Sequence, residues 1–409
     1  MLTPYDEFPV HQASRPFSHI PSTDYSWDDG YFFAVYQPEL GIWLQTGMRV
    51  NPNADMIGGY AVFVQDNKQF TLRMNRCWRR EFDLKIGPLR YEVLEPLKKW
   101  RLVLEANDSG LEFDVIWEGA SPPMLEDHHV ATNRGRRTTD QSRYSQPGTG
   151  AGRIHFRGSE LSLDPKTWGA SRDHSWGLYA ERPPLGPLQK WLPPRNMSGK
   201  RRALRFWSVF TTELFSGFYH THEDEDGQQL RNEGDVFATP FEGKLYRRGD
   251  DTPVRLVAYD LDMDFRPGTR VLHKARVRLT DDAGGIWVQE YEVPSMPWTP
   301  RMIGYSPGSW KDGGNFFTYH GSEELAMEWD DLMDISIQPM PPVVYGEGGD
   351  AAQDTFGVRA AADKPQTGTT VNAICRTTSP DGETSVGSAH LDFAVTGAYH
   401  PAGIAADLP

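Results

Sequence analysis

Apolar and polar residues alternate with a period of two along much of this chain, which is the pattern of half-buried β-strands. In Leu111–Trp117 every second residue is large and apolar, and Glu112 and Asp114 stand between them. Similar short segments recur from Tyr31 onward, separated by turn residues such as Pro and Gly. Helical periodicity is scarce, and residues 322–334 are the best candidate for a short helix. The pattern predicts an all-β protein.

Opposite charges support one of the predicted hairpins. Apolar positions alternate with charged ones in 257–265 and again in 271–279, and a Pro267-Gly268 turn separates the two segments. The charged positions are Asp260, Asp262, Asp264, Lys274, Arg276 and Arg278. Folded as a hairpin, the segments set three acids opposite three bases, each pair contributing a few tenths to about 1 kcal/mol.

The distribution of strand patterns predicts two β-domains in tandem. We expect an N-terminal arm at 1–24, a first domain at 25–182, a linker at 183–202 and a second domain at 203–405. The linker contains five prolines, which disfavour any regular element. Two further segments lack a clear period: 119–152 is expected to be a long loop, and the region near 339–369 an insertion in the second domain. Residues 370–376 and 389–396 should form a closing hairpin.

Composition narrows the classes of partner. The 409 residues include 42 Lys and Arg against 56 Asp and Glu, a formal net charge of −14, which argues against nucleic acid and anionic membranes as partners. Cys77 and Cys375 stand far apart and form no metal-spaced pair, so a reducing compartment fits. The N-terminus lacks the features of a secretory signal, and no stretch is apolar enough to span a bilayer. We therefore expect a cytoplasmic protein.

The hexapeptide Arg172–Gly177 concentrates chemistry that the surrounding strands do not require. It reads Arg-Asp-His-Ser-Trp-Gly, so an acid, an imidazole, a hydroxyl and an indole are consecutive. On a strand, Asp173 and Ser175 would point to one face, and His174 and Trp176 to the other. The alternation therefore places a titratable ring beside a large flat aromatic one.

Several motifs together resemble the tandem-lipocalin superfamily, which includes AttH-like proteins and enzymes of the carotenoid 1,2-hydratase (hydroxyneurosporene synthase) type. The resemblance covers roughly residues 24–404. The motifs are Glu95-Pro-Leu-Lys-Lys-Trp100, Tyr144-Ser-Gln146, Trp168-Gly169, the hexapeptide, and His220-Thr-His222 followed by Asp226-Gly227. The resemblance implies two lipocalin-like antiparallel β-barrels, with a pocket for an apolar ligand where the domains meet.

The same resemblance implies a set of catalytic residues. In the hydratases an imidazole and an indole two positions apart, followed later by a tyrosine and an aspartate, form the proposed set. The first pair corresponds to His174 and Trp176. Tyr219 corresponds to the tyrosine, but Thr221 stands where the aspartate is expected.

Hydration of an alkene needs an acid, a surface that tolerates positive charge and a base. Asp173, His174, Trp176 and Tyr219 are therefore the expected catalytic residues, with proton exchange between His174 and Tyr219. The expected substrate-binding residues of the pocket are His220, His222, Asp224, Tyr305, Trp310 and Tyr319. The expected enzyme is a cofactor-independent hydratase, dehydratase or isomerase acting on a hydrophobic terpenoid-like substrate.

Several alternatives stay open at this point. His220 and His222 share a strand face and could be half of a metal site, but no third ligand follows from spacing, so we expect no metal. The chain could instead be a non-catalytic carrier of a hydrophobic metabolite, or a pericyclase that shapes its substrate. A small hydrophobic ligand is the expected partner in each case, and a homodimer is a further open alternative.

Overall fold

The structure is a computed structural model. It describes residues 19–79, 83–133, 135–179, 202–230, 240–297, 303–304, 309–330, 332–336 and 370–408, together with a few residues before 19. The expected linker, apart from Arg202, and the expected insertion near 339–369 lie outside the described residues.

The first body is a 15-stranded sheet, antiparallel at every pairing. Its central order is β20-β4-β3-β2-β1-β13-β11-β8-β7-β6-β5. In chain order its strands are β1 (Trp27–Gln37), β2 (Ile42–Asn51), β3 (Met56–Gln65), β4 (Lys68–Cys77), β5 (Lys85–Ile86), β6 (Leu89–Glu95), β7 (Lys99–Leu104), β8 (Leu111–Gly119), β9 (Met124–Leu125), β10 (His129–Asn133), β11 (Arg136–Phe156), β12 (Ser159–Leu163), β13 (Gly169–Tyr179), β20 (Ala326–Trp329) and β21 (Met333–Asp334).

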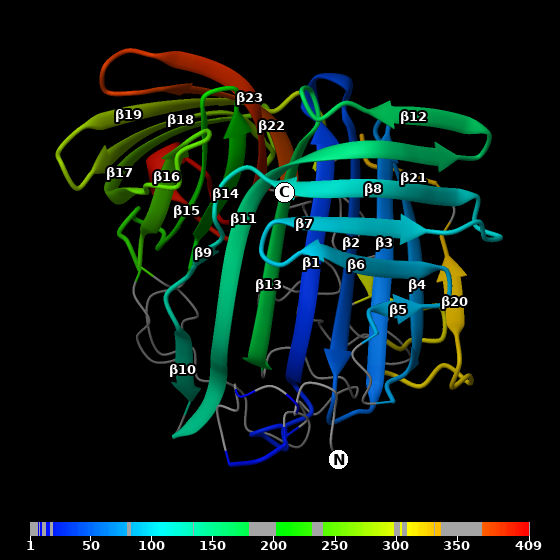
Figure 1. Cartoon of the computed structure of the whole chain (residues 1–409). Helices are drawn as coiled ribbons and strands as arrows, with labels where there is room; N and C mark the ends of the chain where they lie inside the picture. Colours follow the sequence, from blue (N-terminus) through cyan, green and yellow to red (C-terminus); the bar gives the residue numbers. More distant parts are fainter. Residues whose placement is uncertain are drawn as a thin grey trace.

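This sheet curls until β5–β8 cross the face of β1–β4 (Figure 1). The apolar side of each strand turns inward, so Phe33, Phe63, Leu102 and Trp117 belong to one buried cluster. Burying that cluster is the main force that holds the curl. The interior between the crossed strands also receives Ala170 and Arg172 of β13.

The second body is a closed antiparallel barrel. Its strands are β14 (Leu204–Thr212), β15 (Phe215–Glu223), β16 (Glu242–Arg247), β17 (Val254–Phe265), β18 (Leu272–Asp281), β19 (Ile286–Glu292), β22 (Thr370–Thr378) and β23 (Thr384–Val395). Two short 3₁₀ turns, Pro38–Leu40 and His400–Ala402, are the named helical elements of the described chain. The expected fold class, two antiparallel β-domains in tandem, is confirmed, although only the second closes into a barrel through strand pairing.

The two predicted hairpins are confirmed by the register of their strands. In the β17–β18 pair, each aspartate lies directly opposite a basic residue. The partners are Asp260 and Arg278, Asp262 and Arg276, and Asp264 and Lys274. The closing hairpin is the β22–β23 pair, which completes the barrel against β14.

Two local predictions were wrong. The expected loop at 119–152 contains most of β11, a 21-residue strand. Its polar residues misled the pattern because Arg143 and Ser145 face the polar region between the two bodies, and Tyr144 and Gln146 hydrogen-bond to side chains of β13. The expected helix at 322–334 is instead β20 and β21, which pair with β4 of the first sheet although they lie in the expected second domain. Arg73 on β4 draws this segment in through Glu328 and Asp330.

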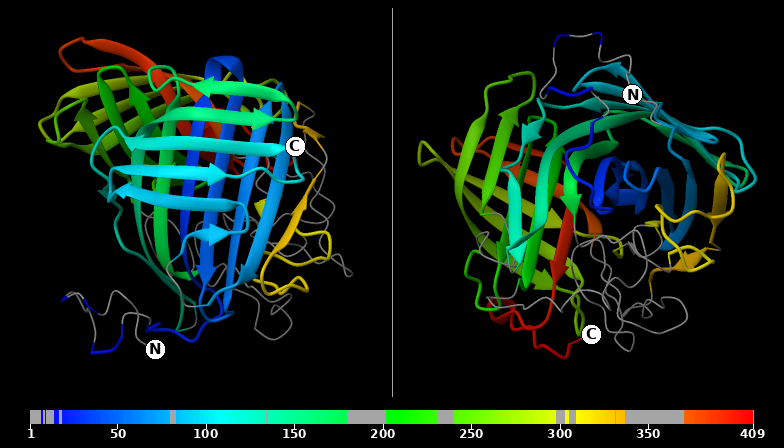
Figure 2. Two further views of the ribbon diagram at one scale, coloured as in Figure 1. Left: turned by 45° about the vertical axis from the view of Figure 1, so that its right-hand side comes forward. Right: turned by 90° about the horizontal axis from the view of Figure 1, so that it is seen from below.

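The two bodies pack side by side, with β14, β15 and β23 of the barrel against β11 and β13 of the sheet (Figures 1 and 2). Met124 from the first body is buried with Trp207, Val209 and Phe218 from the second. A Cβ at Gly169 would lie 1.9 Å from the Ser388 hydroxyl oxygen, so only glycine permits this approach of β13 to β23.

Candidate functional site

Strand β13 separates two polar regions, as the alternation in the hexapeptide predicts. The His174 and Trp176 rings are in contact, with their centroids 5.2 Å apart. The Asp173 carboxylate instead lies 4.0 Å from the Arg143 side chain, and Ser175 accepts a hydrogen bond from Arg49. The final glycine, Gly177, has a φ of +129°, and a Cβ there would lie 2.1 Å from the Asp140 carbonyl oxygen.

On the inner face, His174 lies between a carboxylate and a phenol. Its Nε2 is 2.8 Å from Oδ1 of Asp29, and its Nδ1 is 3.3 Å from the hydroxyl of Tyr144. The imidazole also stacks on Tyr31, with centroids 4.1 Å apart. Because Asp29 can only accept a hydrogen bond when ionised, it favours a proton on Nε2 and leaves Nδ1 to accept from Tyr144.

Arg172 extends this chain of polar groups into the core. Its Nη1 donates to the Tyr144 hydroxyl at 3.3 Å, and its Nε donates to Gln146 at 2.8 Å. The guanidinium is fully buried and lies over the rings of Trp100, Trp117 and Tyr144. Burial lowers the pKa of Arg172, but an arginine remains charged at neutral pH.

Two influences act in opposite directions on the pKa of the Tyr144 phenol. Burial raises its pKa, and the charge and hydrogen bond of Arg172 lower it. The group also reaches the surface, because Trp176 is 36% exposed and Asp29 lies beside it on the neighbouring strand. The result is a continuous series, Asp29, His174, Tyr144 and Arg172, that runs from the surface into the first body.

Tyr219 does not join this series, so the expected exchange of a proton between His174 and Tyr219 is corrected. Tyr219 points into the core of the second barrel, where its hydroxyl is 2.7 Å from that of Tyr291. Burial raises its pKa well above the usual value. His174 lies on β13 of the first body, whereas Tyr219 lies on β15 of the second barrel and faces its interior. The two side chains are therefore separated.

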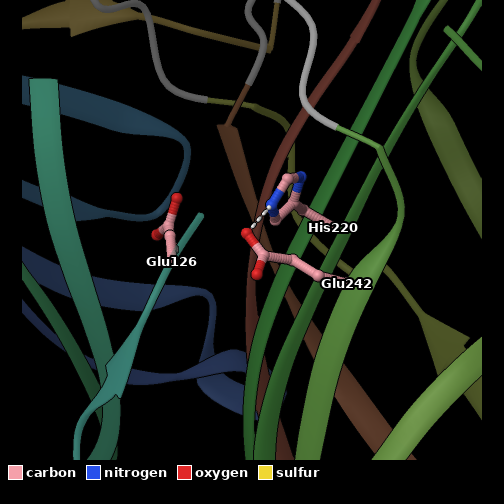
Figure 3. A group of neighbouring side chains, drawn as sticks. All are labelled: Glu126, His220 and Glu242. Atoms are coloured by element: carbon pink, nitrogen blue, oxygen red, sulfur yellow. Dashed lines mark hydrogen bonds and ion pairs between the residues drawn. The ribbon is translucent and has the colours of Figure 1, made fainter. Parts of the chain in front are cut away.

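The outward face of β15 carries His220 and His222 into the polar region between the two bodies. Figure 3 shows His220 facing Glu242, with Glu126 across from them. The His220 Nε2 lies 2.9 Å from Glu242, and the Ser145 hydroxyl donates to Glu126 at 2.6 Å. Ligand atoms of Glu126, His220 and Glu242 all lie within 4.8 Å of one another. These three residues form the interdomain cluster.

Other ionisable side chains surround the interdomain cluster. Arg205 donates to Asp392 at 2.6 and 2.9 Å, and its Nη1 lies 3.1 Å from His222. His129 lies 3.6 Å from Glu126, and burial lowers the pKa of this imidazole well below its usual value. Asp173, on β13, borders the same region through Arg143. The expected residues Asp173, His220 and His222 therefore share a region that excludes His174.

The remaining expected pocket residues do not line either region. Asp224 is buried and accepts the backbone N–H groups of Asp226 and Gln228, so it shapes a turn. Trp310 stacks on His320 in the segment that covers the outer face of the first sheet. Tyr319 is 57% exposed, and Tyr305 lies outside the described residues.

A cavity of about 420 Å³ opens at the second barrel. Its wall contains Glu223, Phe241, Tyr259 and Tyr399. The two phenols donate to the Glu223 carboxylate at 2.7 and 2.6 Å. Burial raises the pKa of Glu223 more strongly than these hydrogen bonds lower it. The sequence did not indicate this carboxyl, because its two partners, Tyr259 and Tyr399, come from separate and distant segments.

The raised pKa of Glu223 predicts a specific pH dependence of stability. The neutral carboxyl contributes stability that is present below about pH 4.5, its usual pKa, and is lost as the pH rises through the raised value. Glu223→Gln stays neutral, so its stability relative to the wild type should increase as the pH rises above 4.5. Urea unfolding from pH 4 to 8 measures this difference. The exposed Glu213→Gln is the control, and an equal slope for both variants would contradict the assignment.

Most of the partner residues could not be found from spacing. Asp29, Tyr144 and Glu242 are ordinary polar positions in strands, and Glu126 follows a strand of two residues. Only Tyr144 carried a signal, because Tyr144-Ser-Gln146 is one of the motifs on which the resemblance noted in the sequence is based.

The described part of the chain contains no helix of the length and apolarity that a membrane crossing requires.

The site and fold define an all-β protein with two antiparallel domains and separate polar regions. Similar solved structures include kievitone hydratase from Nectria haematococca, at 10% identity over 91% of this chain and 90% of that chain, with a TM-score of 0.45. CghA with Sch210972 is similar at 8% identity over 90% and 88%, with a TM-score of 0.44. No curated protein matches the chain. A family model matches residues 2–341, and the chain belongs to that family, a family of unknown function (DUF8625).

Proposed function

We propose that the protein is an acid/base enzyme, a hydratase, dehydratase or isomerase for a hydrophobic substrate, and that Tyr144 and His174 transfer the proton. The observation that carries this proposal is the series of hydrogen bonds from Asp29 through His174 to the Tyr144 hydroxyl. A carboxylate that orients an imidazole, which in turn contacts a hydroxyl, is a recurring arrangement for moving a proton.

Each member of the series has a distinct part in this proposal. Tyr144 gives its proton to the substrate or takes one from it, and His174 exchanges that proton through Nδ1. Asp29 stabilises the imidazolium that forms when His174 accepts the proton. Arg172 stabilises the phenolate that forms when Tyr144 gives its proton up.

The surrounding rings suit a hydrophobic substrate. Tyr31, Trp100 and Trp176 supply flat apolar surface near the series, and the π-face of an indole tolerates developing positive charge.

Isotope labelling tests the reaction in either direction. The candidate substrates are compounds released from the purified protein and identified by mass spectrometry. A panel of hydrophobic enones and tertiary allylic alcohols supplements them. Incubation in D₂O should place deuterium on a substrate carbon, and a hydratase should also incorporate ¹⁸O from labelled water. A carrier or a pericyclase would leave every compound without label, and that outcome would overturn the proposal.

A further inference from the structure

We propose that the interdomain cluster of Glu126, His220 and Glu242 is a binding site for one Zn²⁺ ion, which would join the two β-domains. This inference does not depend on the acid/base function, because no residue of the cluster belongs to the Asp29–His174–Tyr144 series. The sequence predicted no metal because no third ligand was apparent beside the two histidines. The tertiary structure supplies two further candidate ligands from distant segments.

Strand pairing fixes the first two ligands. His220 on β15 and Glu242 on β16 are direct partners in the antiparallel register, so their side chains leave the sheet as neighbours. The imidazole Nε2 and a carboxylate oxygen are 2.9 Å apart. The Glu242 carboxylate also accepts the backbone N–H of Asp127, which belongs to the first body.

The third ligand comes from the first body. Glu126 directly follows β9, which pairs with β11 at Ser145 and Met124. The Ser145 hydroxyl donates to one carboxylate oxygen of Glu126 and holds the side chain toward the barrel. A metal ion bound by all three residues would therefore be held by both domains.

The donor set and spacing suit zinc. Zn²⁺ binds imidazole nitrogen and carboxylate oxygen at about 2.0–2.2 Å, so two ligand atoms at a tetrahedral angle lie about 3.4 Å apart. The donor atoms here lie within 4.8 Å of one another, so side-chain rotations that move them by about 1.5 Å or less would complete the site. Mg²⁺ and Ca²⁺ prefer sets made only of oxygen, and the imidazole therefore disfavours them. Three protein ligands leave one position for water.

The burial of two carboxylates in the interdomain cluster also favours a cation there. Glu126 and Glu242 have side-chain exposures of only 1% and 18%. Among the described residues, neither carboxylate has a Lys or Arg nitrogen within ion-pair distance. The neighbouring arginines pair with other acids, Arg143 with Asp173 and Arg205 with Asp392. Buried carboxylates are costly unless they are paired or bind a metal, and one divalent cation would balance these two.

Zinc binding to the full-length protein tests the inference. The purified chain is stripped with a chelator, titrated with ZnSO₄ by calorimetry and assayed for bound metal by mass spectrometry. The expected result is one Zn²⁺ per chain. Glu126→Gln should lower the affinity by at least about 10-fold, because losing a ligand costs no less than losing a residue that supports one. Glu223→Gln, a buried carboxyl outside the cluster, should keep wild-type affinity.

A second measurement separates ligation from misfolding. Zinc should raise the Tm of the wild type and of Glu223→Gln but not that of Glu126→Gln. The reason is that a ligand which binds only the folded state stabilises that state. Co²⁺ substituted for Zn²⁺ should give the visible absorption of a four-coordinate site, absent in His220→Ala. Wild-type affinity in Glu126→Gln, or no uptake by the folded wild type, would overturn the inference. In that case the three residues are a polar contact between domains.

Discussion

His174→Ala should lower turnover by about 100- to 10,000-fold with little change in ligand affinity, the usual range for the loss of a general acid/base group. The imidazole accepts from Tyr144 and donates to Asp29, so its removal breaks the series at its centre. The kcat and KM for a substrate identified by isotope labelling, together with its Kd from equilibrium binding, measure the effect. Tyr144→Phe should show the same split between kcat and Kd, because it removes only the hydroxyl.

The matched control is His155→Ala. His155 is 39% exposed on the first body and contacts Glu112 rather than the His174 series, so its replacement should leave turnover unchanged. Equal losses of turnover and affinity in His174→Ala would indicate that the side chain only shapes the pocket. Unchanged turnover in Tyr144→Phe would refute the proton transfer assigned to Tyr144.

Arg73→Met should destabilise the protein by about 3 kcal/mol, the lower end of the cost of removing one partner from a buried ion pair. Arg73 is 1% exposed, and its guanidinium donates to Glu328 at 2.7 Å and to Asp330 at 2.5 Å. Removing it leaves two carboxylates that are less than one-fifth exposed without this cation. The lower end applies because their remaining exposure lets water solvate them in part. Urea unfolding measures the loss.

The control for Arg73 is Arg79→Met, which breaks a pair with Glu324, two residues before β20. That pair is 50% and 77% exposed, so its loss should cost at most about 1 kcal/mol. Adding Glu328→Gln and Asp330→Asn to Arg73→Met should recover part of the stability, because the uncompensated charges disappear. Equal losses in the two single variants would contradict the buried character of the Arg73 pair. Hydrogen exchange should show β20 opening first in Arg73→Met.

Ion pairs of this kind explain why the sequence misassigned the covering segment. Residues 322–334 contain spacing compatible with a helix, yet Glu328 of β20 pairs with Arg73 of β4, which is 255 residues earlier in the chain. Local preference yields to an edge strand that offers unpaired backbone groups and a buried guanidinium. The same reasoning applies to β11, whose polar residues pair with β13 and with the second body.

The sequence by itself determined the β-class, the two hairpins and the two faces of Arg172–Gly177. These features depend on a period of two and on turn residues, which are local properties of the chain. The tertiary structure decided which side chains meet on each face. Asp29 and Tyr144 reach His174 only through the pairing of β1 and β11 with β13, and Glu126 reaches His220 only because the two bodies pack together. Such contacts depend on register and domain packing, which no spacing within one strand encodes.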